Sequence, residues 1–375
     1  MPSVLKLYDI PLLEFTMDNQ GLDGFHAAVT DYDKAKMHLL PLDLTPDSAS
    51  LTNWLRRRVI PKNRAFVHQI LKQLGLSLND TKGIIEICMG LSLNDSYWIV
   101  PGDFGGMFAD YNLYENPFSK MLSLVAYTGY GTGNEPFTTS PELTTDGMLP
   151  KSWRVEGGTI SLWKGGSVGA ANAGMEPYSE FFAAQVAEAM GLDHVHYDLR
   201  MWKRKLCSVC PIFTDIDTAY IPAGRIVNEG GLPAVLDYYR GLSDEAYQAA
   251  ASMLVFDAVV YNEDRHFGNF GVLRNSHTGE VLGAAPIFDH GLSLFNYALD
   301  DELDDLDIYA SERFAATGVS HDEIVRQVMG PKQKAELRKL IGFEFKPHKS
   351  YTWPAKRRRA IQAFIQRRVT ALLAM

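Results

Sequence analysis

Three polar side chains in the C-terminal half have the types and the spacing needed for chemistry on phosphate groups. Asp264 and Asn269 stand five positions apart in the segment Asn-Glu-Asp-Arg-His-Phe-Gly-Asn-Phe, residues 262–270. Asp289 follows twenty positions later, in Ile-Phe-Asp-His-Gly. In phosphoryl transfer one Asp orients a hydroxyl and accepts its proton, while an Asn and a second Asp hold Mg²⁺ through oxygen atoms. The alternative is an Asx-rich surface turn, whose polar side chains only satisfy backbone groups.

The elements around these residues favour a buried site over a surface turn. Residues 245–261 predict a helix that is apolar nearly all round, and such a helix is buried. After the polar loop, residues 270–274 and 285–288 predict two short strands joined by a turn at 276–279. A purely structural turn has no need of a second carboxylate at the far end of that hairpin.

The motif Asp264-Arg265-His266-x-x-Asn269 resembles the HipA-like branch of the protein-kinase-like fold and, more distantly, phosphatidylinositol kinases. Ordinary protein kinases place His-Arg before the catalytic Asp, and they carry Asp-Phe-Gly where this chain has Phe-Asp-His around Asp289. The resemblance implies an α+β, bilobal protein-kinase-like fold, with a small β-rich N-lobe and a mostly helical C-lobe. It also implies ATP and Mg²⁺ as cofactors, Asp264 as the base, and Asn269 and Asp289 as metal ligands. His266 either positions the loop or contacts phosphate, or it caps the loop by hydrogen bonds.

The same resemblance predicts a phosphate loop at residues 144–151, Thr-Thr-Asp-Gly-Met-Leu-Pro-Lys, which ends in Lys151. The loop contains a single Gly, and a plain hairpin turn at its Asp-Gly dipeptide is the alternative. Family members can modify their own phosphate loop, so Thr144 and Thr145 are candidates for autophosphorylation.

The residues expected to bind the rest of the nucleotide follow in order. Residues 159–164 alternate like a half-buried strand and end in Lys164, which matches the ATP-binding Lys of the family. Glu180, in a helix predicted from 178 to 191, is the expected partner of that Lys. The Gly-rich stretch 165–174 between them predicts a lid or linker.

A buried strand is predicted at residues 206–213, where it enters the hinge between the lobes. Backbone groups near Cys210, Ile212 and Phe213 are expected to hydrogen-bond the adenine base. Cys207 and Cys210, together with His194 and His196, are also the ligand types of a zinc site, which is the competing interpretation of this strand.

Composition favours an intracellular enzyme. The chain has 375 residues, 46% of them hydrophobic, and its net charge of −9 disfavours broad nonspecific binding to nucleic acid. Three cysteines and the absence of an apolar leader after Met1 indicate the cytoplasm rather than secretion. No run reaches about 18 uninterrupted apolar residues, so no membrane span is expected.

Three domains are predicted: an N-terminal accessory region at 1–140 that packs on the N-lobe, the kinase N-lobe up to the hinge at 141–215, and the helical C-lobe at 216–375. Near the end of the chain, residues 300–307 carry six acidic side chains and residues 356–359 are Lys-Arg-Arg-Arg. Both runs predict solvated surface, and the acidic run is alternatively a site for a basic partner.

Three function classes follow. The first is a Ser/Thr protein kinase of a toxin-antitoxin or regulatory system, with a protein substrate and a DNA-binding antitoxin as partner. The second is a kinase for a lipid headgroup or small molecule, which the motif permits equally. The third, a nucleotide-binding pseudokinase used as an interaction module, is disfavoured because Lys164, Asp264, Asn269 and Asp289 are all present.

Overall fold

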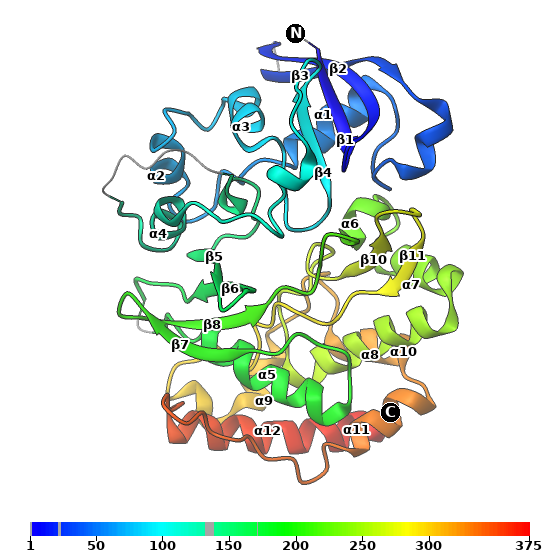
Figure 1. Ribbon diagram of the computed structural model, residues 1–375. Helices are drawn as coiled ribbons and strands as arrows, with labels where there is room; N and C mark the ends of the chain where they lie inside the picture. Colours follow the sequence, from blue (N-terminus) through cyan, green and yellow to red (C-terminus); the bar gives the residue numbers. More distant parts are fainter. Residues whose placement is uncertain (1, 22–23, 132–138, 171) are drawn as a thin grey trace. The chain divides into compact units, whose positions relative to one another are not determined.

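The computed structural model describes residues 2–21, 24–131, 139–170 and 172–375 (Figure 1). The chain divides into two compact units. Unit 1 comprises Met1–Lys164, Ile212–Ile221 and Leu273–Leu282, and unit 2 comprises Gly165–Pro211, Pro222–Val272 and Gly283–Met375. Helices and antiparallel strand pairs occur in both, which confirms the predicted α+β class.

Unit 1 begins with a four-stranded antiparallel sheet in the order β3-β2-β1-β4. Its strands are β1 (Ser3–Leu7), β2 (Ile10–Gly21), β3 (Gly24–Tyr32) and β4 (Tyr97–Pro101). Helix α1 (Ser48–Arg56) packs on β3, and its first turn is capped by the side chain of Asp47. Leu5, Phe15 and Trp54 are buried between sheet and helix, so this region has its own core.

The second part of unit 1 is helical and ends in a hairpin. Its helices are α2 (Val67–Lys72), α3 (Thr81–Cys88) and α4 (Lys120–Thr128), with the short 3₁₀ elements η1 (Lys34–Leu39), η2 (Phe108–Asp110) and η3 (Pro141–Leu143). Strands β5 (Lys151–Glu156) and β6 (Thr159–Gly165) pair antiparallel across Gly157 and Gly158, both of which have positive φ. Strand β6 confirms the strand predicted at 159–164.

Strands β9 (Thr218–Pro222), β10 (Gly271–Asn275) and β11 (Val281–Ala284) form a three-stranded sheet in the order β11-β10-β9. The predicted turn at 276–279 is confirmed, but the strand predicted at 285–288 is wrong, because β11 ends before it begins. Pro286 has no N–H to donate to a neighbouring strand, and Ile287 makes only an isolated bridge with His194.

Unit 2 begins with helix α5 (Glu176–Met190), which confirms the helix predicted from 178, and with strands β7 (Asp198–Trp202) and β8 (Lys205–Pro211). The two strands pair antiparallel around Lys203 and Arg204, which both have positive φ. Strand β8 confirms the strand predicted from 206, but it ends at Pro211, before Ile212 and Phe213.

A bundle of helices makes up the rest of unit 2. Its members are α6 (Ala223–Ile226), α7 (Gly231–Leu242), α8 (Asp244–Val260), α9 (Leu306–Ser311), α10 (His321–Val328), α11 (Pro331–Arg338) and α12 (Ala355–Leu373), with the 3₁₀ turn η4 (Glu302–Asp304). Helix α8 is packed against α7, α10, α11 and α12 (Figure 1). Twelve of its residues are buried, so the predicted apolar helix is confirmed.

One residue of the basic run at 356–359 departs from the prediction of solvated surface. Arg357 is buried, and its guanidinium donates to the carbonyls of Phe295 (2.7 Å) and Ala298. The neighbouring Lys356 forms an ion pair of 2.8 Å with Asp304 in the acidic run. The two runs therefore partly satisfy each other within unit 2, which local charge patterning cannot reveal.

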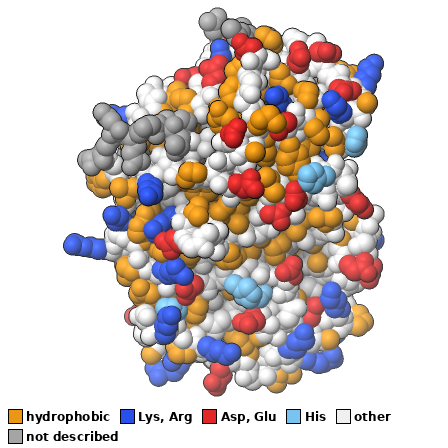
Figure 2. Space-filling view, viewed as in Figure 1, with side chains coloured by type: hydrophobic (Ala, Val, Ile, Leu, Met, Phe, Trp, Pro, Cys, Tyr) orange, Lys and Arg blue, Asp and Glu red, His pale blue; other side chains and the backbone are white. Residues whose placement is uncertain are grey.

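The two compact units divide the predicted N-lobe, because its residues up to Lys164 belong to unit 1 and Gly165–Pro211 belong to unit 2. The three domain boundaries and the bilobal arrangement stay predictions. Acidic and basic side chains are interspersed on the face shown in Figure 2. Within the described ranges, no helix has the length and apolar character required to cross a bilayer.

Candidate functional site

The predicted catalytic loop begins where α8 ends, at Tyr261, which adopts a left-handed backbone conformation. Beyond it the loop folds onto itself. The N–H of His266 donates to the carbonyl of Asp264 (2.7 Å), and the N–H of Asn269 donates to the carbonyl of His266 (2.9 Å). The amide Nδ2 of Asn269 also donates to the carbonyl of Asp264 (3.0 Å). The five-residue spacing therefore closes a compact turn that brings together Asp264 and Asn269.

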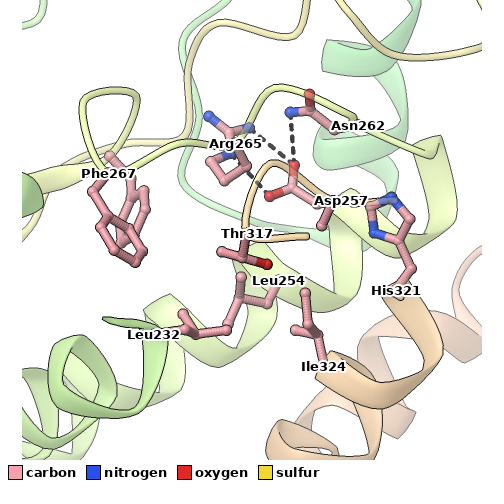
Figure 3. A pocket seen from close by; sticks show the side chains of 11 residues that line it. Leu232, Leu254, Asp257, Asn262, Arg265, Phe267, Thr317, His321 and Ile324 are labelled. Carbon is pink, nitrogen blue, oxygen red and sulfur yellow. Dashed lines mark hydrogen bonds and ion pairs between the residues drawn. The ribbon is translucent and has the colours of Figure 1, made fainter. Parts of the chain in front are cut away.

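A buried arginine, Arg265, holds this loop to the helix before it. Its guanidinium makes a two-pronged ion pair with Asp257 of α8, at 2.9 and 3.0 Å, and the side chain of Asn262 donates to the same carboxylate (3.0 Å; Figure 3). Burial raises the pKa of Asp257, and the charge and hydrogen bonds of Arg265 oppose that rise. Planar guanidinium groups match carboxylates in this geometry, which a lysine cannot reproduce.

The same guanidinium also reaches two backbone carbonyls. It donates to the carbonyl of Asn269 (2.9 Å) and to that of Phe288, the residue before Asp289. The charge of Asp289 is among the causes that raise the pKa of Arg265 against the lowering effect of burial, after the larger effects of Asp257. Arg265 thus joins two segments of the chain that carry the predicted metal ligands.

Asp289 has an unusual backbone, with a φ of 56° that non-glycine residues seldom adopt. Its N–H donates to the hydroxyl of Tyr197 (3.1 Å). Burial raises the pKa of Tyr197 well above its ordinary value, and the charges of Glu180, Cys210 and Asp289 add to the rise. Left-handed residues of this kind occur at active sites, where surrounding contacts hold them in place.

His266 is exposed, and its ring caps the loop. The N–H of Gly268 donates to Nδ1 of His266 at 3.0 Å. A Cβ atom added at Gly268 would lie 2.7 Å from this ring, so a larger residue at that position would displace the ring from its capping position. The capping interpretation of His266 has structural support, and a phosphate contact stays a prediction.

In unit 1, the predicted phosphate loop follows the 3₁₀ turn η3 rather than a strand, so it is not the turn of a β-hairpin. Lys151 is buried, and its Nζ donates to the carbonyl of Asp146 (2.7 Å) within the loop. Gly147 has a φ of 90°, and a Cβ atom added there would lie 2.1 Å from that Nζ. The single glycine is therefore needed both for backbone conformation and for the close approach of Lys151.

The two candidate phosphorylation sites have their hydroxyl groups directed inward. Thr144 donates to the carbonyl of Leu91 (2.8 Å), and Thr145 donates to that of Pro141 (2.7 Å). Modification of Thr144 requires the loop to open first, because this residue is buried, whereas Thr145 is half-buried.

The predicted nucleotide residues divide between the units. Lys164 lies in unit 1 and Glu180 in unit 2, and both side chains are buried. Cys210 lies in β8 of unit 2. In unit 1, the N–H of Ile212 donates to the carbonyl of Ile160 (3.0 Å), and the adenine contact of this residue stays a prediction. Phe213 packs its ring against Tyr220.

The strand that carries Cys207 and Cys210 argues against the zinc interpretation. Both cysteines are buried in β8, and residues three positions apart in a strand point to opposite faces. Nδ1 of His194 is within hydrogen-bond distance of the carbonyl of Leu192, at 2.8 Å. Two thiolates on opposite faces cannot join one tetrahedral site with local histidines.

A pocket in unit 2 is lined in part by residues of the predicted catalytic loop (Figure 3). It is lined by Leu232, Leu254, Asp257, Asn262, Arg265, Phe267, Phe270, Ala315, Thr317, His321 and Ile324. Oγ1 of Thr317 and Nε2 of His321 have no hydrogen-bond partner among the described residues. Burial and the charge of Arg368 lower the pKa of His321 to about 4, so this ring is neutral at physiological pH.

Sequence reasoning missed Asp257, Arg265 and Tyr197 as parts of the site. One signal was available for Asp257, because a carboxylate in an otherwise apolar helix must find a buried partner. Arg265 lies inside the recognised motif and is the first cationic residue after Asp257 in the sequence. The ion pair of these two residues could therefore have been predicted. Tyr197 is remote from the motif and carries no such signal.

The described elements define an α+β chain whose polar loop follows a buried helix. No family model matches the chain, and no curated protein matches its sequence. HipA of the toxin-antitoxin system of Shewanella oneidensis MR-1, solved with HipB and operator DNA, is similar in fold, with a TM-score of 0.53. The identity is 15%, and the match covers 99% of this chain and 96% of HipA. At this identity the likeness is one of fold alone.

A second solved structure, the Helicobacter pylori proinflammatory kinase CtkA, gives a TM-score of 0.47 at 17% identity. That match covers 60% of this chain and 93% of CtkA. A score this low carries no argument about the present chain.

Proposed function

We propose that this protein is a Mg-ATP-dependent phosphotransferase of the HipA-like kind that acts on a Ser or Thr hydroxyl of a protein. The observation that carries the proposal is the junction made by Arg265. One buried guanidinium binds the carbonyl of Asn269 and the carbonyl before Asp289, and so links the loop to the second acidic residue. Asn269 and Asp289 carry side-chain oxygen atoms, the ligand type that Mg²⁺ prefers.

Each residue of the loop then has a role. Asp264 orients the acceptor hydroxyl and takes its proton, and Asn269 and Asp289 hold Mg²⁺ beside the phosphates of ATP. When bound, Mg²⁺ would neutralise the negative charge that develops on the phosphate oxygens during phosphoryl transfer. His266 keeps the loop closed through its contact with Gly268.

The hairpin in unit 1 supports an anion site of its own. Lys151 and Lys164 stand directly opposite each other in the β5–β6 register, and they are only 5% and 8% exposed. Directly opposed residues of an antiparallel pair lie on the same face, so we assign both lysines to the phosphates of ATP, with Glu180 as the partner of Lys164. The adenine contacts near Cys210 and Phe213 are proposals of the same kind, whereas the N–H of Ile212 is already used.

The acceptor and the partner are the finer parts of the proposal. HipA of Shewanella oneidensis was solved with HipB and operator DNA, and a DNA-binding antitoxin is the corresponding partner here. Autophosphorylation at Thr144 or Thr145 requires the loop to release hydroxyls that now bind backbone carbonyls. Mass spectrometry after incubation with Mg-ATP tests this step, and an unmodified loop in active protein would exclude it.

The proposed function is tested by following the label from γ-labelled ATP. The protein is incubated with Mg²⁺ and labelled ATP, with and without a cell extract, and proteins, lipids and small molecules are separated. Label in protein is expected, and Asp289→Asn is the matched control that should abolish it. Label in lipid or metabolites would assign a lipid or small-molecule kinase. Nucleotide binding without transfer would instead assign a pseudokinase.

A further inference from the structure

The predicted phosphate loop is held by a residue from a distant part of unit 1. Arg64 lies between α1 and α2, and its side chain is fully buried. Nη1 donates to the carbonyls of Glu142 (2.7 Å) and Thr145 (3.2 Å), and Nη2 donates to the carbonyl of Lys151 (3.1 Å). One guanidinium thus binds carbonyls at both ends of the loop.

The backbone next to Arg64 reaches the tip of the same loop. The N–H of Ala65 donates to the carbonyl of Met148 at 2.9 Å. Two neighbouring residues of the N-terminal region therefore contact the loop at its start, its tip and its end. No strand pairing fixes the loop over residues 144–150, so these contacts are a large part of what defines its path.

The charge of Arg64 is balanced inside the same cluster. Its Nη2 pairs with the carboxylate of Glu142, which is buried in η3. The other oxygen of that carboxylate accepts from Ser152 Oγ (3.1 Å) and from the N–H of Trp153 (2.8 Å) in β5. The cluster consequently fixes the loop between two anchored elements, η3 before it and β5 after it.

We propose that Arg64 is a positioning residue for nucleotide binding: it sets the path of the 144–151 loop on which Lys151 is presented to phosphate. This proposal rests on the proposed function, because it assigns the loop to ATP. It gives the N-terminal region a direct role in the site. Arg64 touches neither substrate nor cofactor, and it acts only through the loop.

The test compares Arg64→Lys with Arg274→Lys. Lysine keeps the charge beside Glu142, but a single ammonium group cannot reproduce the fork that binds three carbonyls. Arg274 is a matched control, because it is also buried in unit 1 and donates to the carbonyls of Gly279, Leu40 and His38. Circular dichroism establishes that each variant is folded.

Hydrogen exchange measured by mass spectrometry gives the first readout and needs no activity. Arg64→Lys is expected to speed exchange in the 144–151 loop, whereas Arg274→Lys leaves the loop at the wild-type rate. Unchanged exchange in folded Arg64→Lys would overturn the proposal. If Arg64→Lys does not fold, the wild-type protein decides, because the amide of Ala65 must exchange slowly when it is bound to Met148. Exchange of that amide at the rate of an unprotected loop would also contradict the proposal that this segment positions the 144–151 loop.

The second readout is the dependence of activity on ATP. Arg64→Lys should raise KM for ATP about tenfold with little change in kcat. The reason is that the ordered loop loses stabilisation equivalent to roughly one hydrogen bond. Arg274→Lys should leave KM unchanged. Equal KM values in both variants would contradict the positioning role. If exchange of the 144–151 loop is faster in Arg64→Lys but the wild-type protein neither binds nor uses ATP, the proposed function is wrong. The role of Arg64 in positioning the loop is then still supported.

Discussion

Two buried arginines hold the two loops that matter most in this protein, and they do so over very different distances along the chain. Arg265 pairs with Asp257, eight positions away, and binds carbonyls on either side of the proposed metal site. Arg64 pairs with Glu142, 78 positions away, and binds carbonyls around the proposed phosphate loop. Both use the same chemistry, a guanidinium that satisfies one carboxylate and several backbone carbonyls.

The difference lies in what each loop depends on. The proposed catalytic loop of unit 2 is tied to the helix that immediately precedes it, so its geometry is largely a local property. The proposed phosphate loop of unit 1 depends on a segment earlier in the chain, so its geometry requires the N-terminal region to be folded. Changes in the two clusters should therefore have different consequences.

The largest effect is expected from removing either cation. Arg265→Met leaves Asp257 as an unpaired buried charge, which should lower the free energy of unfolding by about 3–5 kcal/mol. Arg64→Met should cost a similar amount through Glu142. Denaturant unfolding measures both, and the double variant with Asp257→Asn should recover much of the loss in unit 2. A loss below about 1 kcal/mol in either single variant would mean that the pair is exposed to water.

The second effect is specific to unit 2 and depends on pH. The pKa of His321 is lowered from 6.5 to about 4, by burial first and then by Arg368, with Asp322 opposing. The unfolded chain therefore binds a proton between those two pH values that the folded chain does not, and stability falls as the pH drops from 6.5 towards 4. The loss should total roughly 3 kcal/mol, since each pKa unit corresponds to about 1.4 kcal/mol.

Denaturant unfolding as a function of pH checks this prediction. His321→Gln should flatten the dependence between pH 6.5 and 4, because it removes the titrating ring. An unchanged slope in that variant would assign the acid sensitivity to other groups.

A third effect separates the two clusters by kinetics. Arg265→Lys keeps a cation beside Asp257 but loses the fork that reaches the carbonyls of Asn269 and Phe288. The metal ligands are then misplaced, and kcat should fall roughly a hundredfold, as small misalignments of catalytic groups do. KM for ATP should change less than kcat. A change in KM alone would mean that Arg265 affects ATP binding, as is proposed for Arg64. The two clusters would then not differ in their effect on kcat and KM.

The smallest effect is expected at Tyr197. Tyr197→Phe removes the hydroxyl that accepts from the N–H of Asp289 and leaves that N–H without a partner. The free energy of unfolding should fall by at most about 1–3 kcal/mol, and by less if a water molecule binds the N–H. Thermal unfolding measures the loss, and Tyr238→Phe is a control within the same unit. Equal stability of both variants would show that the left-handed backbone of Asp289 is held by other contacts.

The parts of the fold that the sequence predicted are those with strong local patterns. Helix α8 is apolar nearly all round, and the turn after it contains polar residues at short spacing, so both were predicted. The strand expected at 285–288 was wrong because the apolar run outweighed Pro286, which cannot donate to a neighbouring strand. Strand β7 went unnoticed because its turn is Lys203-Arg204, without the Gly or Asn that usually marks a tight hairpin.

The parts that the sequence could not predict depend on tertiary contacts. Arg64 carries no sequence signal of its buried position, and Arg357 was assigned to a solvated run, because nothing local distinguishes a buried arginine from an exposed one. Their partners are carbonyls, which every residue carries, so no complementary residue type points to them. In the catalytic loop the residues were predicted, but the arginine that joins them to Asp289 was not.

The measurement that tests the central claim most directly is the rate of phosphoryl transfer by Asp264→Asn. Wild-type protein and the variant are each incubated under single-turnover conditions with γ-labelled ATP, Mg²⁺ and the acceptor protein that took up label in the cell-extract experiment. The affinity for ATP is measured in parallel. We predict that the variant transfers phosphate roughly a hundred- to ten-thousand-fold more slowly, with ATP binding and fold retained. Transfer by Asp264→Asn at a near wild-type rate would contradict the account.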